Sequence, residues 1–270
     1  MREPRGLMVG NWKMHLTHDE ATAHIQKLAS ALPAEALADL SVAVLPPFTA
    51  IPAVRTALQQ TTTTIAYGAQ DLSPRDAGAF TGDVSGAMLA SLGCAYVLVG
   101  HSERRQHHRE DDGTVCAKVQ AAFRHGLVPI LCVGEGLDVR RTGTHVEFAL
   151  AQLEAAVADL GEDAARSLVI AYEPVWAIGT GEVATPQDAQ EVCGALRRRL
   201  GELYSPDVAR NVRVLYGGSV KSTNIAEITA QVDVDGALVG GASLDPEEFS
   251  AVCRRGIGSL RTPTGRGPAR

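Results

Sequence analysis

The chain has 270 residues, and its hydrophobic and charged fractions of 45% and 21% are ordinary for a globular protein. The length allows one large domain or two small ones, and it is enough to bury a sizeable core. Its 31 acidic residues outnumber the 25 Lys and Arg residues, which gives a formal net charge of −6. A general nucleic-acid or anionic-membrane binder needs a broad basic face, so we expect neither kind of partner.

The five cysteines are odd in number, scattered along the chain and form no C-x-x-C pair. This distribution argues against a disulfide scaffold and a zinc site, and it indicates a reducing compartment. No apolar run approaches the ~18 residues of a membrane span, and the first residues contain no signal-peptide apolar region. We therefore expect a soluble, cytoplasmic protein.

Eight short apolar runs alternate along the chain with Ala- and Leu-rich stretches of helical period. Most runs are continuously apolar, which is typical of strands covered on both faces. The predicted strands are residues 7–10, 42–45, 64–67, 96–99, 128–133, 168–172, 212–216 and 236–239. Helix starts are indicated by a capping box from Thr17 to Glu20, and by a cap residue before Pro at Thr185 and Asp245.

Eight strand–helix units predict a parallel sheet wrapped by helices. At this length, eight units favour a single-domain α/β fold, the closed (β/α)8 TIM barrel, over an open doubly wound sheet. The first strand is not followed by G-x-G-x-x-G, which also disfavours the dinucleotide-binding alternative. We expect the barrel to span residues 1–257, and the Gly-, Pro- and Arg-rich residues 258–270 to form a disordered tail.

Chemically versatile residues follow several predicted strands. Asn11 and Lys13 follow the first strand, His101 follows the fourth, and Glu173 follows the sixth. Because the carboxyl ends of barrel strands share one rim, an amide, an amine, an imidazole and a carboxylate are expected to converge there. Each could instead be structural or solvated, but their convergence favours a catalytic site. The pair at residues 107–108 has no third ligand at a suitable spacing, so it predicts a solvated helix face and no metal site.

Glycine pairs follow the last two predicted strands, at residues 217–218 and 240–241. They could be simple turns. However, a chain without Cβ atoms can bring its N–H groups close to phosphate oxygens, and this position matches the recurrent phosphate site of such barrels. The sequence therefore predicts an anionic, phosphate-bearing ligand in spite of the negative net charge.

Five strings of residues, in this order, resemble the triosephosphate isomerase family over about residues 7–256. They are residues 10–14, 100–105, 171–181, 216–220 and 236–241. The resemblance implies interconversion of dihydroxyacetone phosphate and D-glyceraldehyde 3-phosphate without a cofactor. It implies that Glu173 is the base, that His101 is the electrophile, and that Lys13 and Asn11 help to stabilise an enediolate.

The resemblance also implies roles for further residues. The substrate-binding residues would be Asn11, Lys13, Gly179, Ser219, Gly240 and Gly241, with supporting residues Ser102, Glu103 and Cys132. A closing lid would include Pro174, Val175, Trp176, Ala177, Ile178, Gly179, Thr180 and Gly181. Its far hinge reads Glu182-Val183-Ala184, where the family often has Lys-Thr-Ala.

The segment of residues 68–85 resembles the loop through which two copies of the family's chain form a homodimer. The resemblance assigns Gln70, Thr81 and Asp83 to this dimer loop. Thr81 would reach toward Asn11 and Lys13 of the second copy. Asp83 stands where Glu is common, so an ion pair between the two copies would be longer or bridged by water.

Two other functions remain as alternatives. An aldolase could use the same phosphate site, but a Schiff-base aldolase needs a buried lysine on an inner strand, and the lysines do not fall on predicted strands. A metal-dependent aldolase would need a His/Asp cluster, which the sequence does not show. An inactive barrel that serves as a binding protein is disfavoured because Asn11, Lys13, His101 and Glu173 are all present.

Overall fold

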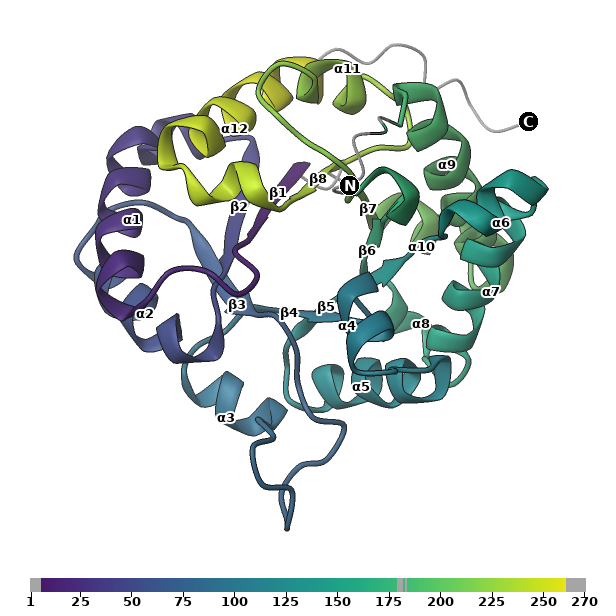
Figure 1. Ribbon diagram of the computed structural model, residues 1–270, viewed down its shortest axis with the longest axis horizontal. Helices are drawn as coiled ribbons and strands as arrows, with labels where there is room; N and C mark the ends of the chain where they lie inside the picture. The colour runs from purple at the N-terminus through teal and green to yellow at the C-terminus, as the bar shows by residue number, and fades with distance from the viewer. Residues whose placement is uncertain (1–5, 179–181, 183, 261–270) are drawn as a thin grey trace.

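A computed structural model shows eight parallel strands that close into a barrel surrounded by helices (Figure 1). The structure describes residues 6–178, 182 and 184–260. The strands pair in chain order, and the eighth pairs with the first. The predicted (β/α)8 barrel is therefore confirmed. Among the described residues, no helix combines the length and apolar character needed to cross a membrane.

Each strand overlaps the run that predicted it. The strands are β1 (Gly6–Asn11), β2 (Leu40–Leu45), β3 (Ala66–Ala69), β4 (Tyr96–Val99), β5 (Val128–Val133), β6 (Val169–Tyr172), β7 (Arg213–Tyr216) and β8 (Gly236–Val239). Only β3 is displaced, by two residues from the predicted 64–67. The threonines just before the predicted run lie in the loop that leads into β3, where the hydroxyls of Thr61 and Thr63 donate to the carbonyls of Leu58 and Leu32 at 2.8 and 3.1 Å.

The helices form an outer layer around the strands (Figure 1). They are α1 (His18–Ala31), α2 (Ile51–Gln59), α3 (Gly86–Ser91), α4 (Ser102–His107), α5 (Asp112–Arg124), α6 (Leu137–Thr142), α7 (His145–Val157), α8 (Glu162–Ala165), α9 (Pro186–Leu203), α10 (Pro206–Asn211), α11 (Ile225–Thr229) and α12 (Pro246–Leu260). Short 3-10 helices are η1 (Ala34–Leu37), η2 (Phe48–Ala50), η3 (Val175–Ala177) and η4 (Gly241–Leu244). Because α12 ends at Leu260, it includes residues 258–260, which the sequence had assigned to the tail. Residues 261–270 lie outside the described part.

The predicted helix starts are present. The backbone N–H of Thr17 donates to Glu20 Oε2 at 2.8 Å before α1, and that of Thr185 donates to Asp188 Oδ2 at 2.8 Å before α9. Asp245 Oδ1 accepts from the N–H of Glu247 at 2.8 Å at the start of α12. These side chains satisfy donors that the first helical turn leaves without partners.

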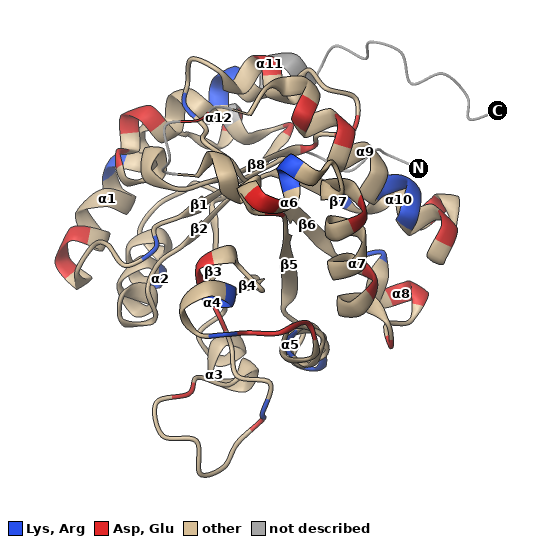
Figure 2. Ribbon diagram, turned by 45° about the vertical axis from the view of Figure 1, so that its right-hand side comes forward, with Lys and Arg blue, Asp and Glu red and all other residues tan. Residues whose placement is uncertain are grey.

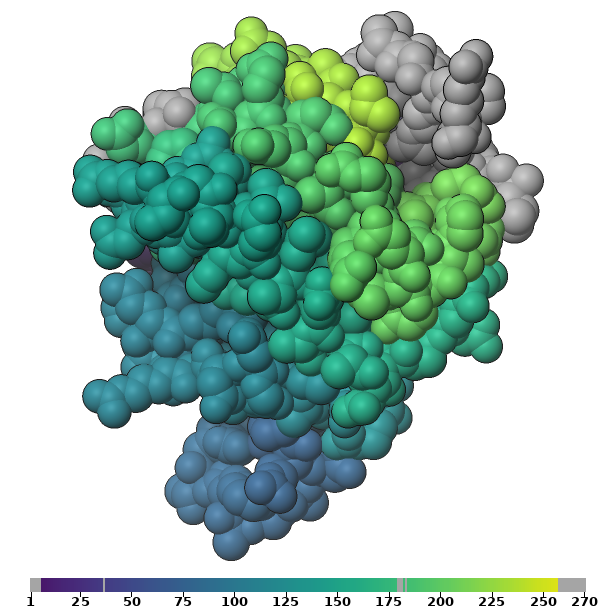
Figure 3. All heavy atoms as spheres, turned by 90° about the vertical axis from the view of Figure 1, so that its right-hand side faces the viewer, coloured from purple at the N-terminus to yellow at the C-terminus, as the bar shows by residue number. Residues whose placement is uncertain are grey.

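The core has two layers. Alternate strand residues, including Leu98, Ile130, Cys132 and Ala171, form a buried cluster inside the barrel, and the remaining apolar positions pack under the helices. This double burial explains the continuously apolar strand runs. Acidic and basic residues are interspersed over the outer helices (Figure 2). The segment between β3 and α3 projects away from the barrel (Figures 1 and 3).

A buried ion cluster links the loop after β3 to α4 and α5. Lys118, which is only 4% exposed, donates to Asp71 Oδ1 and Glu110 Oε1, both at 2.6 Å. Arg104 binds the same two carboxylates at 2.8 and 2.6 Å. Burial raises the pKa of Glu110, but the two cations outweigh burial and hold that pKa below its ordinary value.

Replacing Lys118 by Met would leave two buried carboxylates with a single arginine. We expect the free energy of unfolding to fall by about 3–5 kcal/mol, because an uncompensated charge remains in the interior. The measurement is urea unfolding. Lys27→Met, at an exposed position of α1, is the matched control and should change stability by less than about 0.5 kcal/mol. If the two variants had the same free energy of unfolding, the charge of Lys118 in the buried cluster would contribute nothing to stability.

Candidate active site

The predicted rim residues surround one cavity at the carboxyl ends of the strands. Asn11 ends β1, His101 precedes α4, and Glu173 directly follows β6. The cavity has a volume of about 560 Å³. Its lining includes Asn11, Lys13, His101, Glu173, Gly217, Gly218, Ser219, Gly240 and Gly241. The predicted site residues Gly179, Thr180 and Gly181, and hinge residue Val183, lie outside the described residues.

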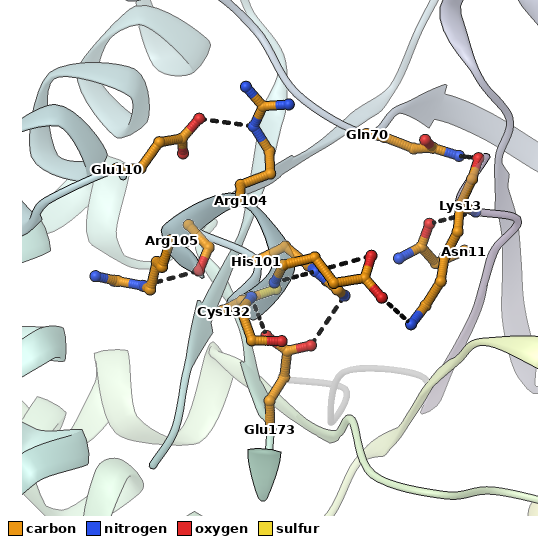
Figure 4. A network of polar contacts seen from close by, with 12 residues as sticks. Asn11, Lys13, Gln70, His101, Arg104, Arg105, Glu110, Cys132 and Glu173 are labelled. Carbon is orange, nitrogen blue, oxygen red and sulfur yellow. Dashed lines mark hydrogen bonds and ion pairs between the residues drawn. The ribbon is translucent and has the colours of Figure 1, made fainter. Parts of the chain in front are cut away.

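Glu173 and His101 are in direct contact (Figure 4). His101 Nε2 lies 2.9 Å from Glu173 Oε1, and the backbone N–H of Ser102 donates to Glu173 Oε2 at 2.9 Å. Both side chains are nearly removed from solvent, since Glu173 is 2% exposed and His101 is 6% exposed. Each carboxylate oxygen of Glu173 therefore already has a donor in this arrangement.

The second ring nitrogen of His101 indicates its tautomer. The backbone N–H of Glu103 points at Nδ1 with an N–N distance of 3.2 Å, so Nδ1 accepts and carries no proton. The proton must then be on Nε2, where it is donated to Glu173. Burial lowers the pKa of His101 while the Glu173 carboxylate raises it, with a net increase. We assign the neutral, Nε2-protonated ring because a second proton on Nδ1 would face the amide of Glu103.

The pKa of Glu173 is set by opposing effects. Burial raises it, but the His101 ring, the Ser102 N–H and the charge of Lys13 together lower it below the ordinary value. Cys132 lies against the base, and burial together with the charge of Glu173 raises the pKa of its thiol well above the usual range. Cys132 is therefore a neutral packing group next to the carboxylate.

Lys13 has an unusual backbone conformation, with φ at 52°. A residue other than glycine in this region needs outside support. Asn11 Oδ1 accepts from the Lys13 N–H at 3.0 Å, and Gln70 Nε2 donates to the Lys13 carbonyl at 2.8 Å. Lys13 Nζ forms an ion pair with Glu103. The Lys13 side chain therefore lines the cavity beside a carboxylate, and Gln70 supports the Lys13 backbone from within the same chain.

The glycines that line the cavity are required for two different reasons. A Cβ on Gly218 would lie 2.2 Å from the Tyr216 hydroxyl oxygen, so packing within the chain requires glycine. Among the described residues, a Cβ on Gly240 would meet only Lys13 Cε at 3.5 Å, and one on Gly241 would meet nothing within 4 Å. The last two glycines thus leave open space over the backbone, as an approaching phosphate would need.

Residues 6–256 match the family model described as triosephosphate isomerase. The chain belongs to the triosephosphate isomerase family. It is 60% identical over 248 residues to the triosephosphate isomerase of Streptomyces coelicolor, a match that covers 92% of this chain and 96% of that one. Those of Mycobacterium tuberculosis and Nocardia farcinica are 57% and 56% identical, and both matches cover 91% of this chain and 94% of the relative. The predicted resemblance is confirmed.

Glu135 has a position for which the sequence predicted no role. It is fully buried, and its Oε1 accepts from the Tyr172 hydroxyl at 3.0 Å and from Trp176 Nε1 at 2.8 Å. Its carbonyl accepts from the N–H of Val175 at 3.0 Å. Glu135 therefore anchors the first residues of the segment that resembles the triosephosphate isomerase lid. The position of an acidic residue just after β5 was a sequence signal for a role at the rim. The sequence could not show that Tyr172 and Trp176 donate hydrogen bonds to it.

The residues of the predicted dimer loop have contacts within their own chain. Asp83 Oδ2 accepts from the Ser73 hydroxyl at 2.6 Å, and Gln70 donates to the carbonyl of Leu45 at 2.8 Å. Thr81 is exposed on the projecting segment. Within the described residues, no group of three or more His, Cys, Asp or Glu side chains could hold a metal ion.

Gly134 was also missed, and it controls the position of the base. A Cβ there would lie 1.8 Å from the carbonyl oxygen of Glu173, so Gly134→Ala must displace the backbone that carries the carboxylate. We expect a loss of about 1–3 kcal/mol in the free energy of unfolding, measured in urea. Gly136→Ala, two residues later, is the control because its Cβ would meet nothing within 4 Å. A Gly134→Ala protein as stable as this control would contradict the packing argument.

Proposed function

We propose that the chain is a triosephosphate isomerase that interconverts dihydroxyacetone phosphate and D-glyceraldehyde 3-phosphate through an enediolate. The observation that carries this proposal is the buried contact of 2.9 Å between Glu173 and His101 in a cavity that Lys13 also lines. A glutamate base, a neutral histidine and a closing loop are the established pattern of this family, so the roles below follow that pattern.

The reaction needs one group that transfers a proton between two carbons and other groups that donate hydrogen bonds to the substrate oxygens. Glu173 takes a proton from the carbon next to the substrate carbonyl and returns it to the neighbouring carbon. Negative charge develops on the substrate oxygens in between, and His101 Nε2–H, Lys13 and Asn11 can donate to them. A neutral imidazole is a suitable donor here because its acidity is close to that of the enediol, whereas an imidazolium is a much stronger acid.

The phosphate end of the cavity holds the non-reacting part of the substrate. The open backbone at Gly240 and Gly241 can donate N–H groups to phosphate oxygens, and Lys13 adds positive charge nearby. Binding energy from the phosphate then contributes to stabilising the transition state. Closure of the segment at residues 174–184 would exclude water and oppose loss of phosphate from the enediolate.

We also infer a cytoplasmic homodimer that uses the projecting segment. Exposed apolar side chains support this inference, since Met14 is 93% exposed and Phe80 is 45% exposed. A second cavity of about 290 Å³, lined in part by Lys13, Met14 and Gln70, lies beside the catalytic one and could receive Thr81 of a second copy. The interspersed surface charges support the expectation of no nucleic-acid or membrane partner (Figure 2).

The structure favours an isomerase over a Schiff-base aldolase. Lys13 is paired with Glu103, and Lys118 is paired with two buried carboxylates away from the cavity lining. A Schiff-base aldolase needs an amine that is free to attack the substrate carbonyl, and the amines of both lysines are engaged with carboxylates instead.

The proposed function is tested by a coupled assay with D-glyceraldehyde 3-phosphate and no added metal. We expect rapid conversion by the wild type and a loss of about 10²–10⁴ in kcat for Glu173→Gln, which cannot act as a base. The control is Glu147→Gln, at an exposed position of α7, which should retain full turnover. Near-normal turnover of Glu173→Gln would remove the base assignment, and an inactive wild type would contradict the proposed function.

A further inference from the structure

The segment that resembles the lid has two described ends, and each end has contacts with the rest of the chain; the first end, residues 174–178, is called the first flank, and the second, from residue 184 into the start of α9, is called the second flank. On the first flank, the Trp176 indole donates to Glu135, and the carbonyl of Ala177 accepts from the Ser219 hydroxyl at 3.0 Å. On the second flank, the N–H and hydroxyl of Thr185 donate to Asp188 Oδ2 at 2.8 and 2.7 Å. The first flank therefore joins the base to the phosphate end of the cavity, and the second flank starts α9.

A single guanidinium contacts both flanks. The Cζ atom of Arg140 lies 5.3 Å from the centroid of the Trp176 ring, and Arg140 Nη2 donates to Asp188 Oδ1. The two oxygens of Asp188 thus connect Arg140 to Thr185. A planar guanidinium can stack on an indole and bind a carboxylate at the same time, which a lysine ammonium does less well.

The surroundings of Arg140 favour a fixed position. Its side chain is one-fifth exposed, and Nη1 lies 3.7 Å from Glu191 Oε2, which is itself 3.1 Å from His145 Nε2. Burial raises the pKa of Asp188, but the Thr185 donors and Arg140 outweigh burial and hold it below the ordinary value, so this carboxylate is charged near neutral pH. A partly buried pair of this kind is screened less than a fully exposed one.

We propose that Arg140 is a positioning residue, which fixes Trp176 and Thr185 relative to each other and thereby holds the backbone that carries Glu173. The proposal rests on the proposed function and adds a residue that is not among those that line the cavity in the described part of the chain. Trp176 is only three residues from Glu173, and small displacements of a catalytic group cost large factors in rate. Loss of Arg140 should therefore reduce kcat more than it changes KM.

The test compares Arg140→Met with Arg141→Met, an identical exchange at the next residue of α6, where the side chain is exposed. We expect Arg140→Met to lower kcat about tenfold, to change KM less than about twofold, and to release more inorganic phosphate per turnover. Arg141→Met should match the wild type. Arg140→Lys, which keeps the charge and loses the planar stack, should give intermediate values.

The proposal would be overturned if Arg140→Met had the same kcat as Arg141→Met and released the same amount of inorganic phosphate per turnover. If Arg140→Met fails to fold, Asp188→Asn replaces it, because it removes the charge that binds Arg140; unchanged kcat in that variant would overturn the proposal.

A measurement without substrate separates this proposal from the proposed function. The chain has two tryptophans, and Trp12 is fully buried, so acrylamide quenching of fluorescence reports chiefly on Trp176. Stronger quenching in Arg140→Met than in Arg141→Met would support the contact even if the wild type did not isomerise the triose phosphate. Equal quenching in the two variants would overturn it.

Discussion

The closure of the sheet is the constraint on which the rest of the structure depends. Because β8 pairs with β1 and all neighbours are parallel, every strand ends on the same rim. Asn11, His101 and Glu173 are far apart in the sequence and still line one cavity. The barrel interior beneath them is filled with apolar side chains, so polar groups have room only at the rim.

Within that rim, Glu173, the proposed base, is held in a state that must change if it is to take a proton from a substrate. Both oxygens of Glu173 accept hydrogen bonds, and those bonds keep its pKa low although the residue is buried. In the proposed reaction, a substrate that competes for His101 would remove one of these two contacts from the carboxylate. The effect of burial would then weigh more and would raise the basicity of Glu173. On this proposal, the free site keeps the carboxylate ionised and the occupied site makes it a stronger base.

The sequence predicted those features of the fold and the site that depend on local pattern. Continuous apolar runs located the strands because both of their faces are buried, and polar residues after them located the rim. The prediction was displaced by two residues at β3, and it was wrong at residues 258–260, where α12 continues through a Gly-containing stretch. Gly134 and Glu135 were missed because their importance comes from neighbours that only the fold brings close, namely the Glu173 carbonyl and the Trp176 indole.

The buried ion cluster connects stability with the geometry of the site. Asp71 follows Gln70, whose amide holds the Lys13 carbonyl in place, and Arg104 belongs to the helix that begins just after His101. Lys118 and Arg104 bind Asp71 and Glu110 together, so they fix both of these segments to α5. Apolar packing could stabilise this region equally well, since buried ion pairs add little net stability over a hydrophobic substitute. Hydrogen bonds between charged groups are more directional, however, and direction is what Lys13 at positive φ and His101 at a helix start require.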